Sequence, residues 1–177
     1  MNNFLASMSG TNKILLGVIL GGMMSVDLGG PVNKAAYTFG TGMLAEGHYD
    51  IMAAVMVGGM VPPLAIALLA TFFPKKIAKK ERQSALLNYI MGLAFISEGA
   101  IPFAAADPIR VLAACIIGSG VAGGLSMAFN CTLMAPHGGI FVLPVIGHPL
   151  LFLLSLIIGS WVATLILSML KKNVVEK

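Results

Sequence analysis

The sequence has very few charged residues, and this scarcity decides the class of protein. Only 10% of the residues are Asp, Glu, Lys or Arg, whereas 58% are hydrophobic and the mean hydropathy is +0.93. A soluble domain carries about 25% charged residues. Residues 51–74 and 111–170 contain no charged residue, and a membrane-spanning helix needs about 20 apolar residues. The composition therefore excludes a soluble globular domain and predicts an all-α polytopic membrane protein.

Cysteine is equally scarce, which argues against a disulfide framework. Cys115 and Cys131 both lie in the apolar run of residues 111–135, where thiols act as small packing groups. The first residues also lack a basic segment followed by a cleavable apolar core, so we expect no signal peptide. Residues 14–26 instead predict a first membrane helix.

The basic residues that are present are concentrated at two points of the chain. Eight of the eleven lie in residues 75–82 and 171–177, each directly after an apolar run. The positive-inside rule predicts that both segments are cytoplasmic, with contact to anionic lipid as a second use. The net charge of +4 is thus an orientation signal and does not indicate a nucleic-acid partner. Residues 1–177 are expected to form a single membrane domain.

The apolar stretches have two lengths, and this predicts the topology. Three of them are long enough to span a bilayer, namely residues 51–73, 109–130 and 149–170. Residues 83–97 suit only half of its thickness. Because both basic segments must lie on one side, an even number of crossings separates them, and two long helices supply it. The short pieces around residues 98 and 137 are then predicted to be re-entrant hairpins. The same count puts residue 51 outside and both termini in the cytoplasm.

Polar breaks interrupt the apolar stretches at residues 27–34, 98–107 and 130–139. Each break combines Gly or Pro with a hydrogen-bonding side chain. Discontinuous helices of this kind are the usual construction of a transport site, because half-helix ends present unpaired backbone groups. The pair Pro62-Pro63 lies within an uninterrupted span and predicts a kink without a ligand role.

These breaks resemble, in order, segments of one family. Residues 97–103 read SEGAIPF and are followed by Asp-Pro. They resemble the Glu-Gly-Ala-Ile-Pro-Phe signature of the membrane (IIC) component of bacterial PEP-dependent sugar phosphotransferase systems, fructose type. Residues 27–37 and 135–139 are similar to further fructose-type segments. The resemblance extends from about residue 12 to residue 170 and corresponds to the C-terminal, sugar-carrying half of such a component.

The resemblance implies a function and a set of partners. Sugar would bind from outside between two re-entrant hairpins, cross the bacterial cytoplasmic membrane, and receive phosphate from a separate phosphorylated IIB protein. The family's N-terminal membrane helices and its A and B domains are absent from the sequence. We therefore expect a second membrane chain to supply the missing half, unless the gene product is truncated, and we expect a homo-oligomer. No phosphoryl-transfer residue, cofactor, metal or nucleic acid is expected.

Five residues are predicted to bind the sugar: Glu98, His137, Asn33, Lys34 and Asp27. The resemblance implies that Glu98 contacts sugar hydroxyls, and a carboxylate is also able to take a proton from a hydroxyl that is being phosphorylated. Its alternative role is a structural acid held by half-helix N–H groups. His137 lies in exposed backbone beside two glycines, which suits close ligand approach. Lys34 is able to pair with Asp27 or Glu98, and an Asp27–Lys34 pair that only holds the break is the alternative.

Four further residues are predicted to shape the breaks: Gly99, Pro102, Asp107 and Gly138. Asp107 precedes Pro108, with Arg110 three residues later, so we expect a helix N-cap and a local ion pair. His48 and His148 are expected to lie outside the site.

Two other classes of function remain open from the sequence. A structural membrane fragment would insert and oligomerise but carry nothing alone. An ion-coupled secondary transporter would use the broken helices to bind an ion. The identity of the sugar is also open among fructose, mannitol-like and glycoside substrates.

Overall fold

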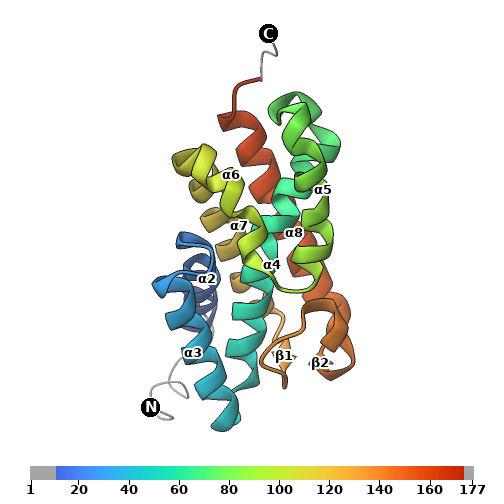
Figure 1. Cartoon of the computed structure of the whole chain (residues 1–177). Helices are drawn as coiled ribbons and strands as arrows, with labels where there is room; N and C mark the ends of the chain where they lie inside the picture. Colours follow the sequence, from blue (N-terminus) through green and yellow to red (C-terminus); the bar gives the residue numbers. More distant parts are fainter. Residues whose placement is uncertain (1–10, 174–177) are drawn as a thin grey trace.

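The computed structural model describes residues 11–173, which are almost entirely helical (Figure 1). The helices are α2 (Thr11–Val26), α3 (Pro31–Ala45), α4 (Tyr49–Phe72), α5 (Lys79–Leu93), α6 (Ile101–Ala106), α7 (Pro108–Ala128) and α8 (Pro149–Leu170). Short 3-10 turns are η1 (Pro74–Lys76), η2 (Ser97–Ala100) and η3 (Gly139–Val145), and a two-stranded sheet pairs β1 (Thr132–Leu133) with β2 (Ile146–Gly147). The prediction of an all-α membrane protein is confirmed.

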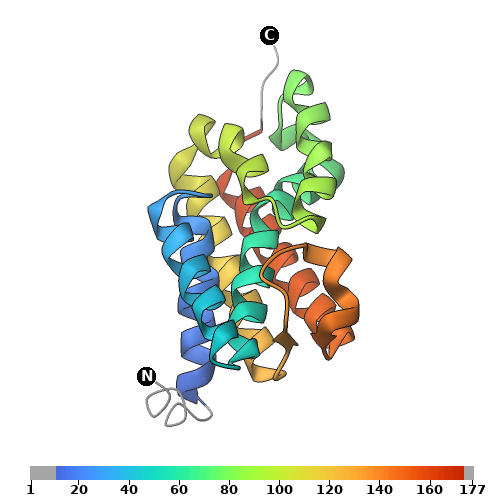
Figure 2. The same cartoon turned by 60° about the horizontal axis from the view of Figure 1, so that its bottom comes forward.

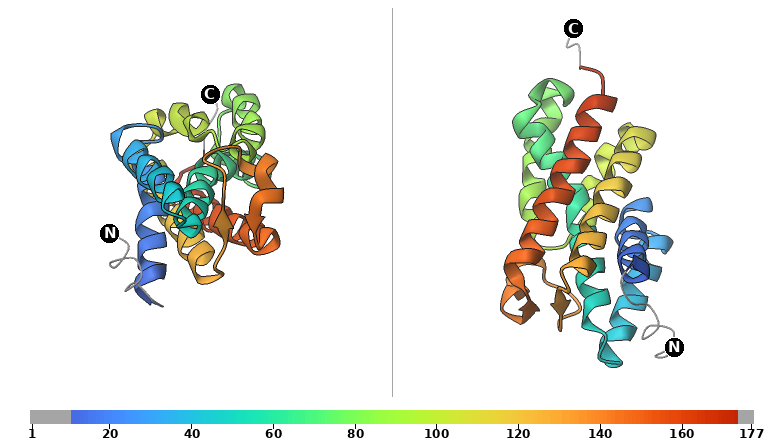
Figure 3. Two further views of the ribbon diagram at one scale, coloured as in Figure 1. Left: turned by 90° about the horizontal axis from the view of Figure 1, so that it is seen from below. Right: turned by 180° about the vertical axis from the view of Figure 1, so that it is seen from behind.

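Helix α4 is the centre of the molecule. It is 24 residues long with a mean hydropathy of 2.1, and α2, α3, α5, α7 and α8 all pack around it. Almost every residue between Ile51 and Ala70 is buried. Helices α7 and α8 have mean hydropathies of 1.9 and 2.5 and run side by side along the back of the molecule (Figure 3). All three helices are long and apolar enough to cross a membrane, which agrees with the three predicted spans.

Two hairpins enter the bundle from opposite ends (Figures 1 and 2). Helix α5 runs inward from one end, the chain turns at residues 94–98, and η2 with α6 returns to the end where α7 begins. The second hairpin connects α7 to α8, and the antiparallel pairing of β1 with β2 closes its base. The two tips meet inside the bundle, where the rings of Phe95 and His137 lie 5.0 Å apart between centroids. The two predicted re-entrant hairpins are therefore present.

The first basic segment and Lys171, which begins the second, lie together at one end of the bundle. The Lys76 ammonium donates a hydrogen bond to the backbone carbonyl of Lys171, over 2.6 Å. This contact joins the loop after α4 to the end of α8. An even number of crossings therefore separates the two segments, as the charge pattern required.

The predicted course of the first apolar stretch was wrong. The Lys13 ammonium forms an ion pair with Asp50 over 2.8 Å and donates to the side-chain oxygen of Asn130 over 3.0 Å. The start of α2 therefore lies beside the start of α4 and the end of α7, opposite the end that holds Lys171 (Figure 1). The prediction that the chain begins on the same side as it ends does not fit residues 11–173. The terminal residues 1–10 and 174–177 lie outside the described part.

The chain reverses its direction between α2 and α3 because of the local backbone geometry there. Leu28 has φ 47° and Gly29 has φ 107°, so both adopt left-handed conformations that end α2 and turn the chain back. Pro31 then begins α3, since its fixed φ suits the first helical turn. Helix α3 therefore starts at Pro31 and returns to the end of the bundle at which α2 begins. Helices α2 and α3 thus form a third hairpin.

This topology predicts which sites are labelled from each side of the membrane. Single cysteines at Asn12 and Glu46 should react with an impermeant maleimide from one side, and cysteines at Lys80 and Lys172 from the other. The experiment uses oriented vesicles and a background without the two native cysteines. Labelling of Asn12→Cys and Lys172→Cys from the same side would contradict the hairpin formed by α2 and α3.

Candidate functional site

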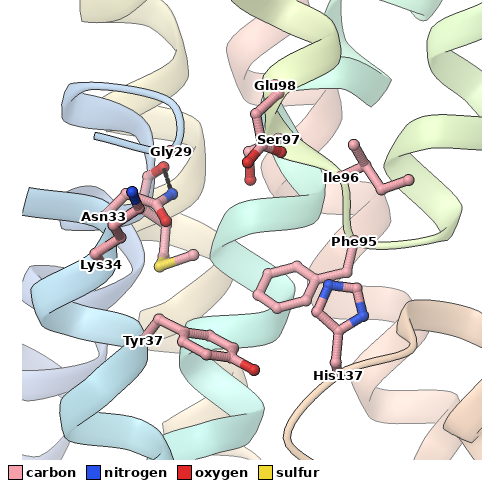
Figure 4. Close-up of a pocket in the computed structure, with 10 residues that line it drawn as sticks. Gly29, Asn33, Lys34, Tyr37, Phe95, Ile96, Ser97, Glu98 and His137 are labelled. Carbon is pink, nitrogen blue, oxygen red and sulfur yellow. Dashed lines mark hydrogen bonds between the residues drawn. The ribbon is translucent and has the colours of Figure 1, made fainter. Parts of the chain in front are cut away.

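A cavity of about 420 Å³ lies where the three hairpin tips converge beside α4 (Figure 4). It is lined by Met24, Gly29, Asn33, Lys34, Tyr37, Phe95, Ile96, Ser97, Glu98 and His137. Four of the five residues predicted to bind sugar therefore share one cavity, although they come from three separate sequence segments. The cavity lies near the middle of α4, because Ser97 contacts Gly59, the eleventh residue of that helix.

Helix α3 forms the first wall of the cavity. Asn33, Lys34 and Tyr37 are spaced i, i+1 and i+4, which brings their side chains toward one face of the helix. The Asn33 amide nitrogen donates to the Met24 carbonyl over 2.7 Å, so that the Asn33 amide oxygen is left without a partner among residues 11–173. The Lys34 ammonium forms no ion pair within the same residues. The predicted pairs of Lys34 with Asp27 or Glu98 are not formed.

Asp27 does not line the cavity but holds the turn behind it. Its two carboxylate oxygens accept hydrogen bonds from the backbone N–H groups of Val32, over 2.7 Å, and Asn33, over 2.9 Å. These N–H groups belong to the first turn of α3 and have no partner within the helix. Asp27 thus satisfies the start of α3 and fixes the orientation of Asn33 toward the cavity.

Glu98 forms the second wall, at the tip of the first re-entrant hairpin. Its side chain is exposed to the cavity, and its carboxylate accepts no hydrogen bond and forms no ion pair within residues 11–173. A Cβ atom added to Gly29 would lie 2.8 Å from Glu98 Oε1, so the carboxylate lies close to the turn between α2 and α3. The alternative role for Glu98, a structural carboxylate held by backbone N–H groups, is therefore not seen among residues 11–173.

Aromatic rings and His137 form the third wall. The Phe95 ring lies between Tyr37, at 6.3 Å, and His137, at 5.0 Å between ring centroids (Figure 4). Tyr37 and Phe95 were not among the residues predicted from the sequence to bind the sugar. Two signals were available for them: Tyr37 lies one helical turn after Asn33, and Phe95 precedes Glu98 by three residues. Together with the charged groups, these rings give the cavity both polar and apolar surfaces.

The residues predicted to shape the breaks serve in different ways. Gly99 packs against the Asn88 side chain, so the two arms of the first re-entrant hairpin approach closely. Pro102 lies in the first turn of α6, and Gly138 has φ 129° at the tip of the second hairpin. Asp107 occupies the N-cap position of α7, as predicted, although its carboxylate makes no hydrogen bond to the helix. Its predicted ion pair with Arg110 is confirmed at 3.2 Å.

Neither cysteine is placed to act as a nucleophile. Cys115 and Cys131 are both free and buried. Burial raises the pKa of the Cys131 thiol above its usual value. A thiol with a raised pKa is largely protonated and therefore a poor nucleophile. Residues 11–173 also contain no group of three His, Cys, Asp or Glu side chains that could hold a metal ion.

Comparison with known proteins identifies relatives along the whole chain. The chain is 55% identical over 177 residues to the fructose permease IIC component of Bacillus amyloliquefaciens. It is 53% identical over 177 residues to the fructose-specific EIIABC component of Bacillus subtilis, and 52% identical over 181 aligned residues to the fructose-specific EIIB'BC component of Vibrio cholerae. No family model matches the sequence, and no solved structure matches it.

These relatives are longer than the chain. All three alignments cover 100% of the chain, but they cover 58%, 28% and 31% of the respective relatives. The chain spans a little over half of the shortest of the three. Its similarity is therefore to one part of these fructose-specific components.

The contact between the two re-entrant hairpins generates a prediction for stability. Gly139 has φ 58°, and its added Cβ would overlap the Leu93 carbonyl group, whose carbon is 2.9 Å away. Gly139→Ala should lose about 1–2 kcal/mol to backbone strain and about 1–3 kcal/mol more to overpacking. The matched control is Gly47→Ala, since Gly47 has φ 83° with nothing within 4 Å. Thermal unfolding in detergent compares the two, and equal losses would show that the hairpin contact is loose.

Proposed function

We propose that this chain, whose sequence is related from end to end to the membrane components of fructose-type phosphotransferase systems, forms the sugar-carrying part of a fructose permease in the bacterial cytoplasmic membrane. The observation that carries the proposal is the convergence of Asn33, Lys34, Glu98 and His137 on one cavity. Its volume of about 420 Å³ lies within the range of about 300–1,000 Å³ that is usual for small-molecule sites.

The groups around the cavity are those that recognise a sugar. A sugar presents hydroxyl groups around its ring and apolar C–H groups on the ring faces. The Glu98 carboxylate accepts from hydroxyl donors, the Lys34 ammonium donates to hydroxyl oxygens, and the free amide oxygen of Asn33 accepts as well. Phe95 and Tyr37 supply apolar surface for the C–H groups. Glu98 and Lys34 have no protein partner among residues 11–173, so both are free to bind a ligand.

The sugar hydroxyl that receives phosphate must lose its proton. Glu98 is the carboxylate at the cavity and acts as the acceptor for that proton. The phosphoryl group itself comes from a separate IIB protein, because the buried cysteines of this chain do not serve as carriers. The relatives from Bacillus subtilis and Vibrio cholerae include a B component in their names. A second membrane chain supplies the remaining membrane half, and the assembly is a homo-oligomer.

The charge distribution orients the permease in the membrane. The end that carries residues 75–82 and Lys171 faces the cytoplasm, following the positive-inside rule. The start of α2 and the beginning of α4 then face outward, as the Lys13–Asp50 ion pair requires. The IIB protein approaches from the basic end, which is also the end from which the hairpin bearing Glu98 enters.

Glu98→Gln tests the proposal most directly. The amide is the same size but loses the charge, so fructose affinity should fall about 10–100-fold, since hydrogen bonds to a charged group contribute about 1.5–3 kcal/mol. Uptake of fructose should be lost while membrane insertion is retained. The measurement is fructose uptake by cells that also contain the remaining membrane half and the phosphorylated IIB protein. Glu46→Gln, which changes an exposed carboxylate outside the cavity, is the matched control.

The outcomes separate the three classes of function. Normal uptake by Glu98→Gln would rule out its role in this permease. Insertion of the unmodified chain without fructose binding would indicate a structural membrane fragment. Uptake that requires an ion gradient, but no phosphorylated IIB protein, would indicate a secondary transporter.

Lys34 provides a second test that depends on charge. Lys34→Met keeps the length of the side chain but removes the ammonium, and should lower fructose affinity about tenfold, equivalent to about 1.4 kcal/mol. Lys34→Arg keeps the charge and should retain most of the binding. Lys80→Met removes a charge from the basic segment instead and serves as the control. Fructose affinity that is equal in Lys34→Met and Lys80→Met would exclude Lys34 from the binding site.

A further inference from the structure

Two prolines follow two glycines by four residues in the middle of α4, and this spacing frees two backbone carbonyls. In an α-helix the N–H of residue i donates to the carbonyl of residue i−4, and proline has no N–H. Pro62 therefore leaves the Gly58 carbonyl without its helical donor, and Pro63 leaves the Gly59 carbonyl without one. Both glycines are buried within a membrane-spanning helix, where water is not available to replace the missing donors.

Two serine hydroxyl groups from other segments take the place of these donors. Ser119 of α7 donates to the Gly58 carbonyl over 2.8 Å, and Ser97 donates to the Gly59 carbonyl over 2.8 Å. The hydroxyl of Ser25, in α2, lies 2.5 Å from that of Ser119. Because Ser119 gives its single proton to Gly58, Ser25 is the donor in this second bond. One freed carbonyl thus fixes α2 and α7 to α4, and the other fixes the tip of the hairpin.

The second of these bonds lies directly beside the cavity. Ser97 is the residue before Glu98, and it is 4% exposed. Gly59 also allows the tip to approach, because a Cβ there would overlap the Phe95 ring and lie 2.9 Å from Met24 Cε. The carboxylate of Glu98 is thus one residue away from an anchor on the central helix, whereas Glu98 itself has no protein partner within residues 11–173.

We propose that Ser97 is a positioning residue whose hydroxyl, bound to the Gly59 carbonyl that Pro63 leaves free, sets the place of the Glu98 carboxylate in the cavity. Because Ser97 donates its hydroxyl proton to the Gly59 carbonyl, it does not donate that proton to the ligand. It acts instead by holding the neighbouring Glu98 in place. Pro63 has a defined part in the site because it makes the acceptor available. The identity of the ligand rests on the proposed function, whereas the anchor itself does not.

Ser97→Ala and Ser119→Ala form a matched pair that tests this role. Each removes one hydroxyl from one freed carbonyl of α4, so both should lower the unfolding temperature to a similar extent. Only Ser97→Ala releases the hairpin tip, and it should lower fructose affinity about tenfold. Ser119→Ala should bind fructose as the parent chain does, and Ser97→Thr, which keeps the hydroxyl, should retain affinity. Binding is measured on the full chain together with the remaining parts of the permease.

A double variant separates positioning from stability. Pro63→Ala restores an N–H at residue 63, which is able to donate to Gly59 as in a regular helix. Pro63→Ala combined with Ser97→Ala should therefore regain the unfolding temperature lost in Ser97→Ala, but not the fructose affinity. Recovery of both would mean that Ser97 is only structural and would overturn the proposal.

Hydrogen–deuterium exchange supplies a readout that needs no ligand. Backbone exchange in residues 95–99 should rise in Ser97→Ala and remain high in the double variant, whereas Ser119→Ala should leave it unchanged. Exchange that responds in this way, in a parent chain that binds no fructose, would reject the proposed function and keep the anchor. Unchanged exchange in Ser97→Ala, in a parent chain that binds fructose, would reject the anchor alone.

Discussion

The structure depends on the satisfaction of backbone carbonyls inside an apolar helix. Pro62 and Pro63 remove two N–H groups from the middle of α4, and a bilayer offers no water to replace them. Hydroxyl groups from two other segments fill these positions, at 2.8 Å each. Two carbonyls that would be costly to leave unpaired therefore form specific contacts with other segments. These contacts determine which segments lie against α4 and at what height along it.

The same constraint explains the difference between the two acids at the breaks near the cavity. Asp27 accepts from two backbone N–H groups at the start of α3, so its charge is used within the fold. Glu98 has no such donors among residues 11–173, although it lies at a similar break. A carboxylate without a partner is costly in a membrane protein and is retained where it has a function. The acid that is used within the fold and the acid that is free to bind a ligand are distinguished by their protein partners.

The three hairpins give the cavity its composition. Helices α2 and α3 contribute an amide and an ammonium, the hairpin after α5 contributes the carboxylate, and the loop after α7 contributes an imidazole. The tips enter from opposite ends of the bundle and contact one another through Phe95 and His137. The amide and the ammonium therefore share α3, whereas the carboxylate and the imidazole lie on two other segments. Relative movement of these segments would change the distances between the groups, which suits a site that must bind and release a ligand.

The sequence alone determined the membrane class, the three spans, the two re-entrant hairpins and four residues of the cavity. It did so because charge is costly in lipid, and because Gly and Pro interrupt helices through their local backbone conformation. Only the tertiary structure decided the direction of α3, since the left-handed turn at Leu28 and the Lys13–Asp50 contact are not visible in a count of apolar residues. The tertiary structure also showed which groups bind the carbonyls that Pro62 and Pro63 leave free. The sequence predicted only a kink at these prolines. The hydroxyls that bind the freed carbonyls lie 38 and 61 residues after the glycines concerned, and they meet α4 only after folding.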